Sequence, residues 1–181
     1  MTSRTFSYTL AKIAGVAVVA IVLMCKLWHQ QCSPADLQVF LYLVQKAVSL
    51  LHSVPSVYAG SMGYYFPNLA IVIDKSCAGV NFFLLTFGLL SLMLLSRART
   101  GVQVAKAVTV SVFVSYALTE LVNILRICGA VRLSRWEENF RWLASGWFHE
   151  AYGASLYMLA LASVYTYFQK SGKLDLHLNV K

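Results

Sequence analysis

The sequence predicts an all-α integral membrane protein: a small, multi-spanning helical bundle of about four transmembrane helices, with interfacial helices and a short β-hairpin on the outer side. Of its 181 residues 59% are hydrophobic and only 12% are charged, whereas soluble domains carry about 25% charged residues. Four apolar segments are long enough to cross a bilayer core of roughly 30 Å, namely Tyr8–Trp28, Cys77–Ser96, Gly101–Ile127 and His149–Phe168. A chain of this length is expected to form one domain, residues 1–181.

The first apolar segment is interpreted as an uncleaved membrane anchor. It resembles the apolar region of a signal peptide, but no small-x-small cleavage site follows it. Cys25 follows Leu23-Met24, where a lipoprotein processing site would place a small residue directly before the cysteine. Cys25 is therefore expected to be a small buried apolar residue.

Basic residues indicate the orientation of the spans. The formal net charge is +8, but the Lys and Arg residues flank apolar spans, which favours contact with membrane lipids over binding to nucleic acid. Three regions are rich in basic residues and are expected in the cytoplasm by the positive-inside rule: the N-terminus, Ser96–Lys106 and the C-terminal tail. Segments 29–76 and 131–148 then lie outside, and the second, with its Trp and Arg residues, suits an interfacial helix.

The outer segment 29–76 has structure of its own. Ala35–His52 is predicted to be an amphipathic helix that lies at the interface or packs on the bundle, started by Ser33 or Asp36. Its apolar face is expected to comprise Val39, Leu43, Ala47, Leu50 and Leu51. The stretch SVPSVYAGSMG is expected to be a loop. In YYFPNLAIVID two β-prone runs flank Pro67-Asn68, which predicts a hairpin leading directly into Cys77.

Cys77 is a candidate nucleophile. At the first turn of a helix, capped by Ser76, a cysteine would meet the positive end of the helix dipole, which favours the thiolate. Gly79 permits close backbone approach, and Asn81, four residues after the cysteine, is expected on the same helix face. Taken alone, however, a membrane cysteine is more often inert packing.

The third span carries a polar stripe that must face the interior of a bundle in lipid: Ser111, Ser115, Thr119 and Asn123, with Glu120 beside it. Asn123 and Arg126 are three residues apart and therefore neighbours at its outer end. The forked guanidinium of Arg126 suits a developing oxyanion, although a terminal arginine often only snorkels to the headgroups.

His149 opens the fourth span on the same side and is the candidate base, although His29 and His52 are also predicted to lie outside. Cys32 and Cys128 are both outer residues, which leaves a disulfide between them open. The four His and four Cys lack metal-ligand spacing, so neither a metal nor a cofactor is expected.

Three motifs in this order resemble the exosortase/archaeosortase family in a compact single-domain form. They are Cys77-Ala78-Gly79 at a helix start, Asn123-Ile124-Leu125-Arg126 at the outer end of the next span, and His149 opening the following one; the resemblance covers roughly residues 60–168, the expected catalytic core. The usual Cys-Ser-Gly of the family reads Cys-Ala-Gly here, which keeps the nucleophile and removes one neighbouring hydroxyl.

The resemblance implies a multi-pass cysteine protease/transpeptidase of the bacterial inner membrane with its active site on the outer, periplasmic side. Its partners would be exported proteins with a C-terminal sorting signal: a short motif, a transmembrane helix and a basic tail. Cys77 would form a thioester acyl-enzyme, His149 would move protons and Arg126 would stabilise the oxyanion or orient the thiol.

Two other classes of function stay open on the residues alone. One is a non-enzymatic multispanning subunit, a transporter or assembly component whose polar stripe mediates helix packing; such a protein would tolerate Cys77→Ala. The other is a cysteine acyltransferase acting on lipid, which would show lipid labelling of Cys77 without any protein substrate.

Overall fold

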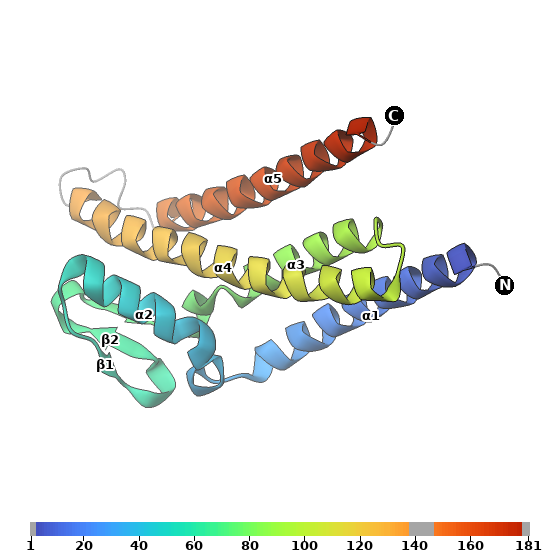
Figure 1. Ribbon diagram of the computed structural model, residues 1–181. Coiled ribbons are helices and arrows are strands. Elements are labelled where there is room, and N and C mark those ends of the chain that lie inside the picture. The colour runs from blue at the N-terminus through green and yellow to red at the C-terminus, as the bar shows by residue number, and fades with distance from the viewer. Residues whose placement is uncertain (1–2, 138–146, 179–181) are drawn as a thin grey trace. The chain divides into compact units, whose positions relative to one another are not determined.

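The computed structural model describes residues 3–137 and 147–178, with side chains over 9–133 and 150–170 (Figure 1). It divides into two compact units, Met1–Val131 and Arg132–Lys181, and each is described by itself. The described chain is mostly helical, and its α-helices are α1 (Ser3–Gln31), α2 (Gln38–His52), α3 (Val80–Leu95), α4 (Gly101–Glu137) and α5 (Trp147–Leu178).

Three helical segments of the described chain are long and apolar enough to cross a membrane: Thr9–Gln31, Lys75–Leu95 and Gly101–Leu133. They match the first three predicted spans, and the third extends beyond the predicted end at Ile127. The protein is thus a small helical membrane bundle, as predicted.

The fourth predicted span, His149–Phe168, is helical within α5, but α5 is not among these three segments. Tyrosines at four positions, together with glycine, serine and threonine, lower its mean hydropathy; the tyrosines are Tyr152, Tyr157, Tyr165 and Tyr167. That α5 crosses the membrane therefore stays a prediction.

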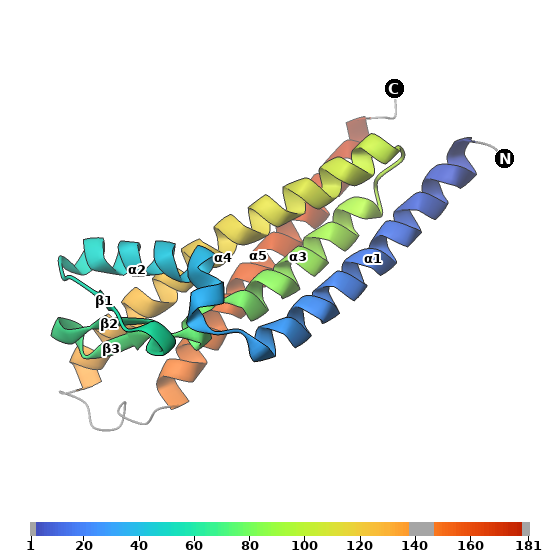
Figure 2. The ribbon, with the colours of Figure 1, turned by 90° about the horizontal axis from the view of Figure 1, so that it is seen from below.

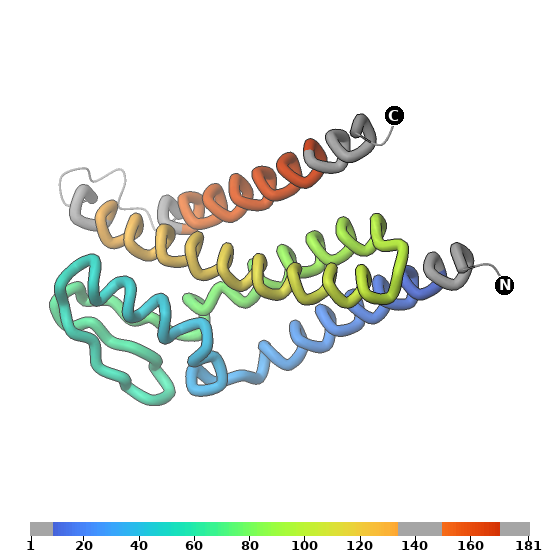
Figure 3. Tube along the Cα trace, in the orientation of Figure 1, coloured from blue at the N-terminus to red at the C-terminus, as the bar shows by residue number. Residues whose placement is uncertain are grey.

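Within the first unit, α1 runs beside α3, and α4 lies along α3 (Figures 1 and 2). Val18 of α1 packs with Phe87 and Leu95 of α3 and with Ala107 of α4. The backbone trace in Figure 3 shows how the short turn after α3 reverses the chain into α4. This apolar packing of three helices provides the frame on which the region around Cys77 is built.

The face that α2 buries differs from the prediction. Leu41, Val44 and Val48 are buried, whereas the predicted residues Val39, Leu43, Leu50 and Leu51 are 43–79% exposed. Because α2 is apolar on most of its circumference, helical spacing fits more than one face. Packing against Phe66, Ile73 and the chain around Ala78 selects the face that is buried.

The start of the α2 region agrees with the prediction in part, because Ser33 caps a 3₁₀ turn and the α-helix itself begins only at Gln38. A 3₁₀ turn, Pro34–Leu37, precedes α2, and Ser33 donates from its backbone N–H and its hydroxyl to Asp36 Oδ2, at 2.8 and 2.7 Å. These two hydrogen bonds hold the pKa of the exposed Asp36 carboxyl below its usual value, and the bond from the Ser33 backbone N–H has the larger effect. The charged carboxylate therefore supports this turn at neutral pH.

A three-stranded antiparallel sheet follows α2, in the order β1 (Val57–Tyr58), β2 (Tyr64–Phe66), β3 (Ile71–Ile73). The predicted hairpin is confirmed: β2 pairs with β3 around Pro67-Asn68, with Phe66 opposite Ile71. The predicted loop SVPSVYAGSMG is wrong in part, because Val57 and Tyr58 pair with Tyr65 and Tyr64. Tyr64 also donates its hydroxyl to Gln38 Oε1 at 2.6 Å, which ties the sheet to α2.

Candidate functional site

Cys77 lies in a 3₁₀ turn, Lys75–Ala78, between β3 and α3. The cap of this turn is Asp74, whose Oδ1 accepts the backbone N–H of Ser76 at 2.9 Å, and Cys77 N–H donates to the Asp74 carbonyl oxygen at 3.0 Å. The predicted Ser76 cap and the predicted place of Cys77 in the first turn of an α-helix are therefore wrong. Gly79 adopts a left-handed φ of +68° that ends the 3₁₀ turn, and α3 begins only at Val80.

A hydroxyl lies beside the candidate nucleophile. Ser76 Oγ donates to Asp74 Oδ1 at 2.6 Å and lies 3.9 Å from Cys77 Sγ. This hydroxyl belongs to the residue before the cysteine, whereas the Cys-Ser-Gly motif would place a hydroxyl on the residue after it. Asp74 was missed by the sequence analysis, although Asp-x-Ser is a recognisable signal for a turn in which an aspartate side chain binds the backbone two residues on.

Gly79 brings the 3₁₀ turn Lys75–Ala78, here called the cysteine turn, into close contact with α4. A Cβ atom at this position would lie 3.0 Å from Thr119 Cγ2 and 3.3 Å from Asn123 Nδ2. Asn123 is fully buried, and its side-chain amide donates a hydrogen bond to the carbonyl oxygen of Cys77. The close approach predicted for Gly79 is thus made to α4, and Asn123 holds the backbone of the turn that contains Cys77.

Arg126 lies one helical turn beyond Asn123 on α4 and is partly buried. Its guanidinium is near enough to Cys77 to interact with it electrostatically. The structure therefore brings together Cys77, Gly79, Asn123 and Arg126, four of the six residues singled out in the sequence.

Asn81 does not share a face with Cys77, contrary to the prediction. It is exposed and accepts a hydrogen bond from Lys26 Nζ of α1. The four-residue spacing places side chains on one face only in a continuous helix, and Gly79 interrupts the helix between the two residues. Lys75 Nζ in turn donates to the carbonyl oxygen of Gln30 at 2.9 Å, so the end of α1 is bonded to α3 through Lys26 and to the 3₁₀ turn through Lys75.

His149 belongs to α5 in the second unit, and its side chain lies outside the described part of the structure. The two other histidines that were predicted to lie outside belong to the first unit. His29, near the end of α1, is half-buried and within electrostatic range of Lys75, which is two residues before Cys77. His52 ends α2. His29 is thus the alternative base whose surroundings adjoin the cysteine turn.

The polar stripe of α4 faces the interior, as predicted. Ser111, Ser115, Thr119 and Asn123 are fully buried, and Glu120 is 6% exposed. The Ser111 hydroxyl donates a hydrogen bond to the Ala107 carbonyl oxygen at 2.8 Å. Among the side chains described over 9–133 and 150–170, the Ser115 and Thr119 hydroxyls and the Glu120 carboxyl oxygens are buried without a protein hydrogen-bond partner.

Cys32 and Cys128 are both thiols, so the disulfide that the sequence left open is not formed. Cys32 instead donates its S–H to the Trp28 carbonyl oxygen at 3.3 Å. Burial raises the pKa of the Cys32 thiol, and the nearby Asp36 carboxylate raises it further. Across the described ranges, no three His, Cys, Asp or Glu side chains are grouped as metal ligands would be.

Replacement of Gly79 by alanine should destabilise the fold by more than its left-handed backbone alone requires. An L-residue in this conformation costs about 1–2 kcal/mol, and the added methyl would also crowd Thr119 Cγ2 at 3.0 Å. Gly60→Ala is the matched control, because Gly60 has a φ of +59° with no atom within 4 Å of its added Cβ. In thermal unfolding in detergent, the melting temperature of Gly79→Ala should be clearly lower than that of Gly60→Ala. Equal melting temperatures would show that the close contact between Gly79 and α4 does not contribute to stability.

A comparison with protein families identifies the family of this chain. The family model described as transmembrane exosortase matches residues 4–166, which is nearly the whole chain. No curated protein and no solved structure matches the chain. The matched range contains the cysteine turn, the whole of α4 and most of α5. The chain is a multi-pass membrane protein that belongs to the transmembrane exosortase family.

Proposed function

We propose that the protein is a membrane-embedded cysteine protease/transpeptidase that processes the C-terminal sorting signals of exported proteins. The observation that carries the proposal is the packing of the Cys77 turn on α4. There Asn123 binds the Cys77 carbonyl oxygen and Arg126 lies within electrostatic range of the cysteine. Membership of the exosortase family supports the same reading.

In the first half of the proposed reaction, the Cys77 thiol gives up its proton to a base and its sulfur attacks the scissile carbonyl carbon. Arg126 stabilises the negative charge that develops on the carbonyl oxygen. The C–N bond then breaks, the leaving amine takes a proton from the protonated base, and a thioester remains on Cys77.

In the second half, an amine, a hydroxyl or water attacks the thioester and loses its proton to the same base. The C–S bond breaks, and the Cys77 sulfur recovers its proton. His149 is the proposed base. Asn123 and Gly79 act as positioning residues, because they fix the backbone of the nucleophile turn against α4.

The function can be tested with exported reporter proteins that carry the C-terminal tails encoded by genes neighbouring this one. Co-expression with the protein should shorten a reporter whose tail has a motif, an apolar helix and a basic cluster. A hydroxylamine-sensitive adduct between the protein and the reporter should accumulate when acceptors are scarce, since hydroxylamine cleaves thioesters. A reporter that is never shortened and never forms the adduct would contradict the proposal.

We further propose that the protein lies in the bacterial inner membrane with the cysteine turn on the outer side. Asn68, in the turn between β2 and β3, and Thr100, before α4, are both exposed and suit a test of this orientation. In a variant with its native cysteines replaced, Asn68→Cys should react with a membrane-impermeant maleimide in cells whose outer membrane is permeabilised. Thr100→Cys should react only after lysis; labelling of Thr100→Cys before lysis would place the site in the wrong compartment.

A further inference from the structure

An apolar groove of about 760 Å³ runs between α1 and the end of α3. Small residues of α1 open it, namely Ala11, Gly15 and Ala20, and Leu92 and Leu95 of α3 form its opposite wall. Gly15 lies close to α3, since a Cβ there would be in ordinary van der Waals contact with Leu92 Cδ2 at 3.5 Å. The groove belongs wholly to the first unit and lies on spans that face lipid, so an apolar chain is the chemistry that fills it.

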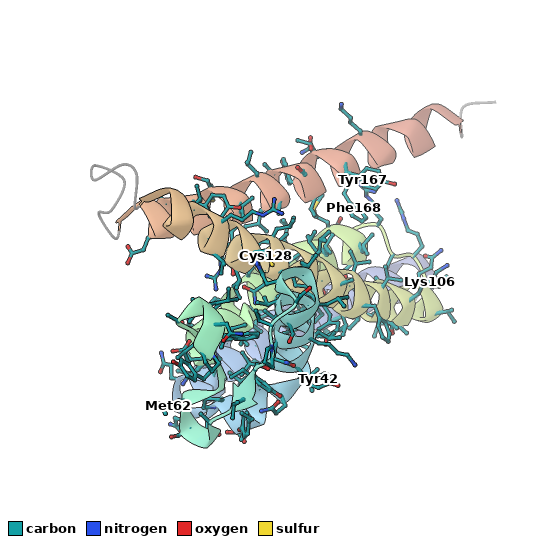
Figure 4. The ribbon with its side chains drawn as sticks, turned by 90° about the vertical axis from the view of Figure 1, so that its left-hand side faces the viewer. Tyr42, Met62, Lys106, Cys128, Tyr167 and Phe168 are labelled. Atoms are coloured by element: carbon teal, nitrogen blue, oxygen red, sulfur yellow. The ribbon has the colours of Figure 1, made fainter. Side chains whose placement is uncertain are left out.

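The end of the groove toward the α3–α4 turn is basic. Lys12 is part of its wall, and Ala98 is shared with a second hollow of about 290 Å³ that Arg97 and Lys106 line. Figure 4 shows Lys106 far along α4 from Cys128, which lies toward the cysteine turn. Residues 1–35 and 75–119 contain no Asp or Glu. The apolar groove thus opens onto a concentration of positive charge.

We propose that this groove is a binding site for one anionic phospholipid. An acyl chain would lie along the apolar walls, and the phosphate headgroup would meet Lys12, with Arg97 and Lys106 nearby. The charges favour this occupant over an apolar helix with a basic tail, since such a tail would bring like charges against Lys12. They also favour an anionic headgroup over a zwitterionic one, because each lysine or arginine near the surface attracts anionic lipid.

The site can be tested by native mass spectrometry of the purified full-length protein in micelles with equal amounts of phosphatidylglycerol and phosphatidylcholine. The protein should retain phosphatidylglycerol preferentially. Lys12→Gln should reduce this retention about fivefold, the effect expected from one lysine near an anionic surface. Lys46→Gln is the matched control, because Lys46 is an exposed lysine of α2 over the Tyr42 ring and does not line the groove.

A second pair of variants tests the apolar part of the site separately. Ala20→Phe places a ring in the groove, whereas Ala17→Phe adds the same ring to an exposed alanine of α1 that is not in the groove wall. Ala20→Phe should lower phosphatidylglycerol retention several-fold and Ala17→Phe should leave it unchanged, with both proteins eluting as folded species. Equal retention of the two lipids by the unmodified protein would overturn the proposal. So would equal losses of phosphatidylglycerol in Lys12→Gln and Lys46→Gln, or in Ala20→Phe and Ala17→Phe. Because the readout is bound lipid, the outcome does not depend on whether the protein cleaves sorting signals.

Discussion

Replacement of Cys77 by alanine is expected to abolish processing of a tailed substrate. The proposed acyl-enzyme requires a sulfur at this position, since no other side chain described in the cysteine turn is a comparable nucleophile. Loss of a catalytic nucleophile typically lowers the rate on the order of 10⁴-fold or more. Cys77→Ser should be nearly as inactive, because a hydroxyl is much less ionised than a thiol near neutral pH.

The matched controls are Cys25→Ala and Cys128→Ala. Both cysteines are partly buried, as Cys77 is, and both pack at the edge of the same apolar cluster. Their loss should have mild effects on stability and leave processing intact. Processing is followed as conversion of the reporter in cells that hold equal membrane amounts of each variant. Full conversion in Cys77→Ala would reject the cysteine mechanism and favour a non-enzymatic membrane subunit.

The fold was largely predictable because long apolar segments have few alternatives in a chain of this composition. Three spans and the hairpin before Cys77 follow directly from the length of the apolar runs and from the turn signal at Pro67-Asn68. The buried face of α2 was not predictable in the same way. Its helical spacing fits several faces, and only contact with residues distant in sequence, such as Phe66 and Ile73, selects one.

The site was predictable where it depends on spacing within one helix. Asn123 and Arg126 lie three apart on α4, so both were expected near the same point, and the polar stripe had to face inward in lipid. The errors arose where the chain changes conformation. Gly79 is left-handed and Asp74 caps the turn through an aspartate side-chain bond, so the periodicity of α3 does not extend back to Cys77 or relate it to Asn81.

Replacement of His149 by alanine is expected to slow processing by about 10²–10⁴-fold, the usual contribution of a general acid–base residue. His29→Ala and His52→Ala are the controls, and His29 is the stricter one, because its surroundings include Lys75 beside the cysteine turn. Both control variants should retain most of the activity. The measurement is the initial rate of reporter cleavage in membranes, compared at equal amounts of protein.

A second readout separates proton transfer from a merely structural role of His149. Imidazole added to membranes that contain His149→Ala should restore part of the activity, because a small base can occupy the space that the side chain leaves. The same addition should leave Cys77→Ala inactive, since imidazole does not replace the sulfur that carries the acyl group. Loss of activity in His29→Ala together with normal activity in His149→Ala would instead assign the base to α1, at the end whose Gln30 carbonyl oxygen accepts a hydrogen bond from Lys75 of the cysteine turn.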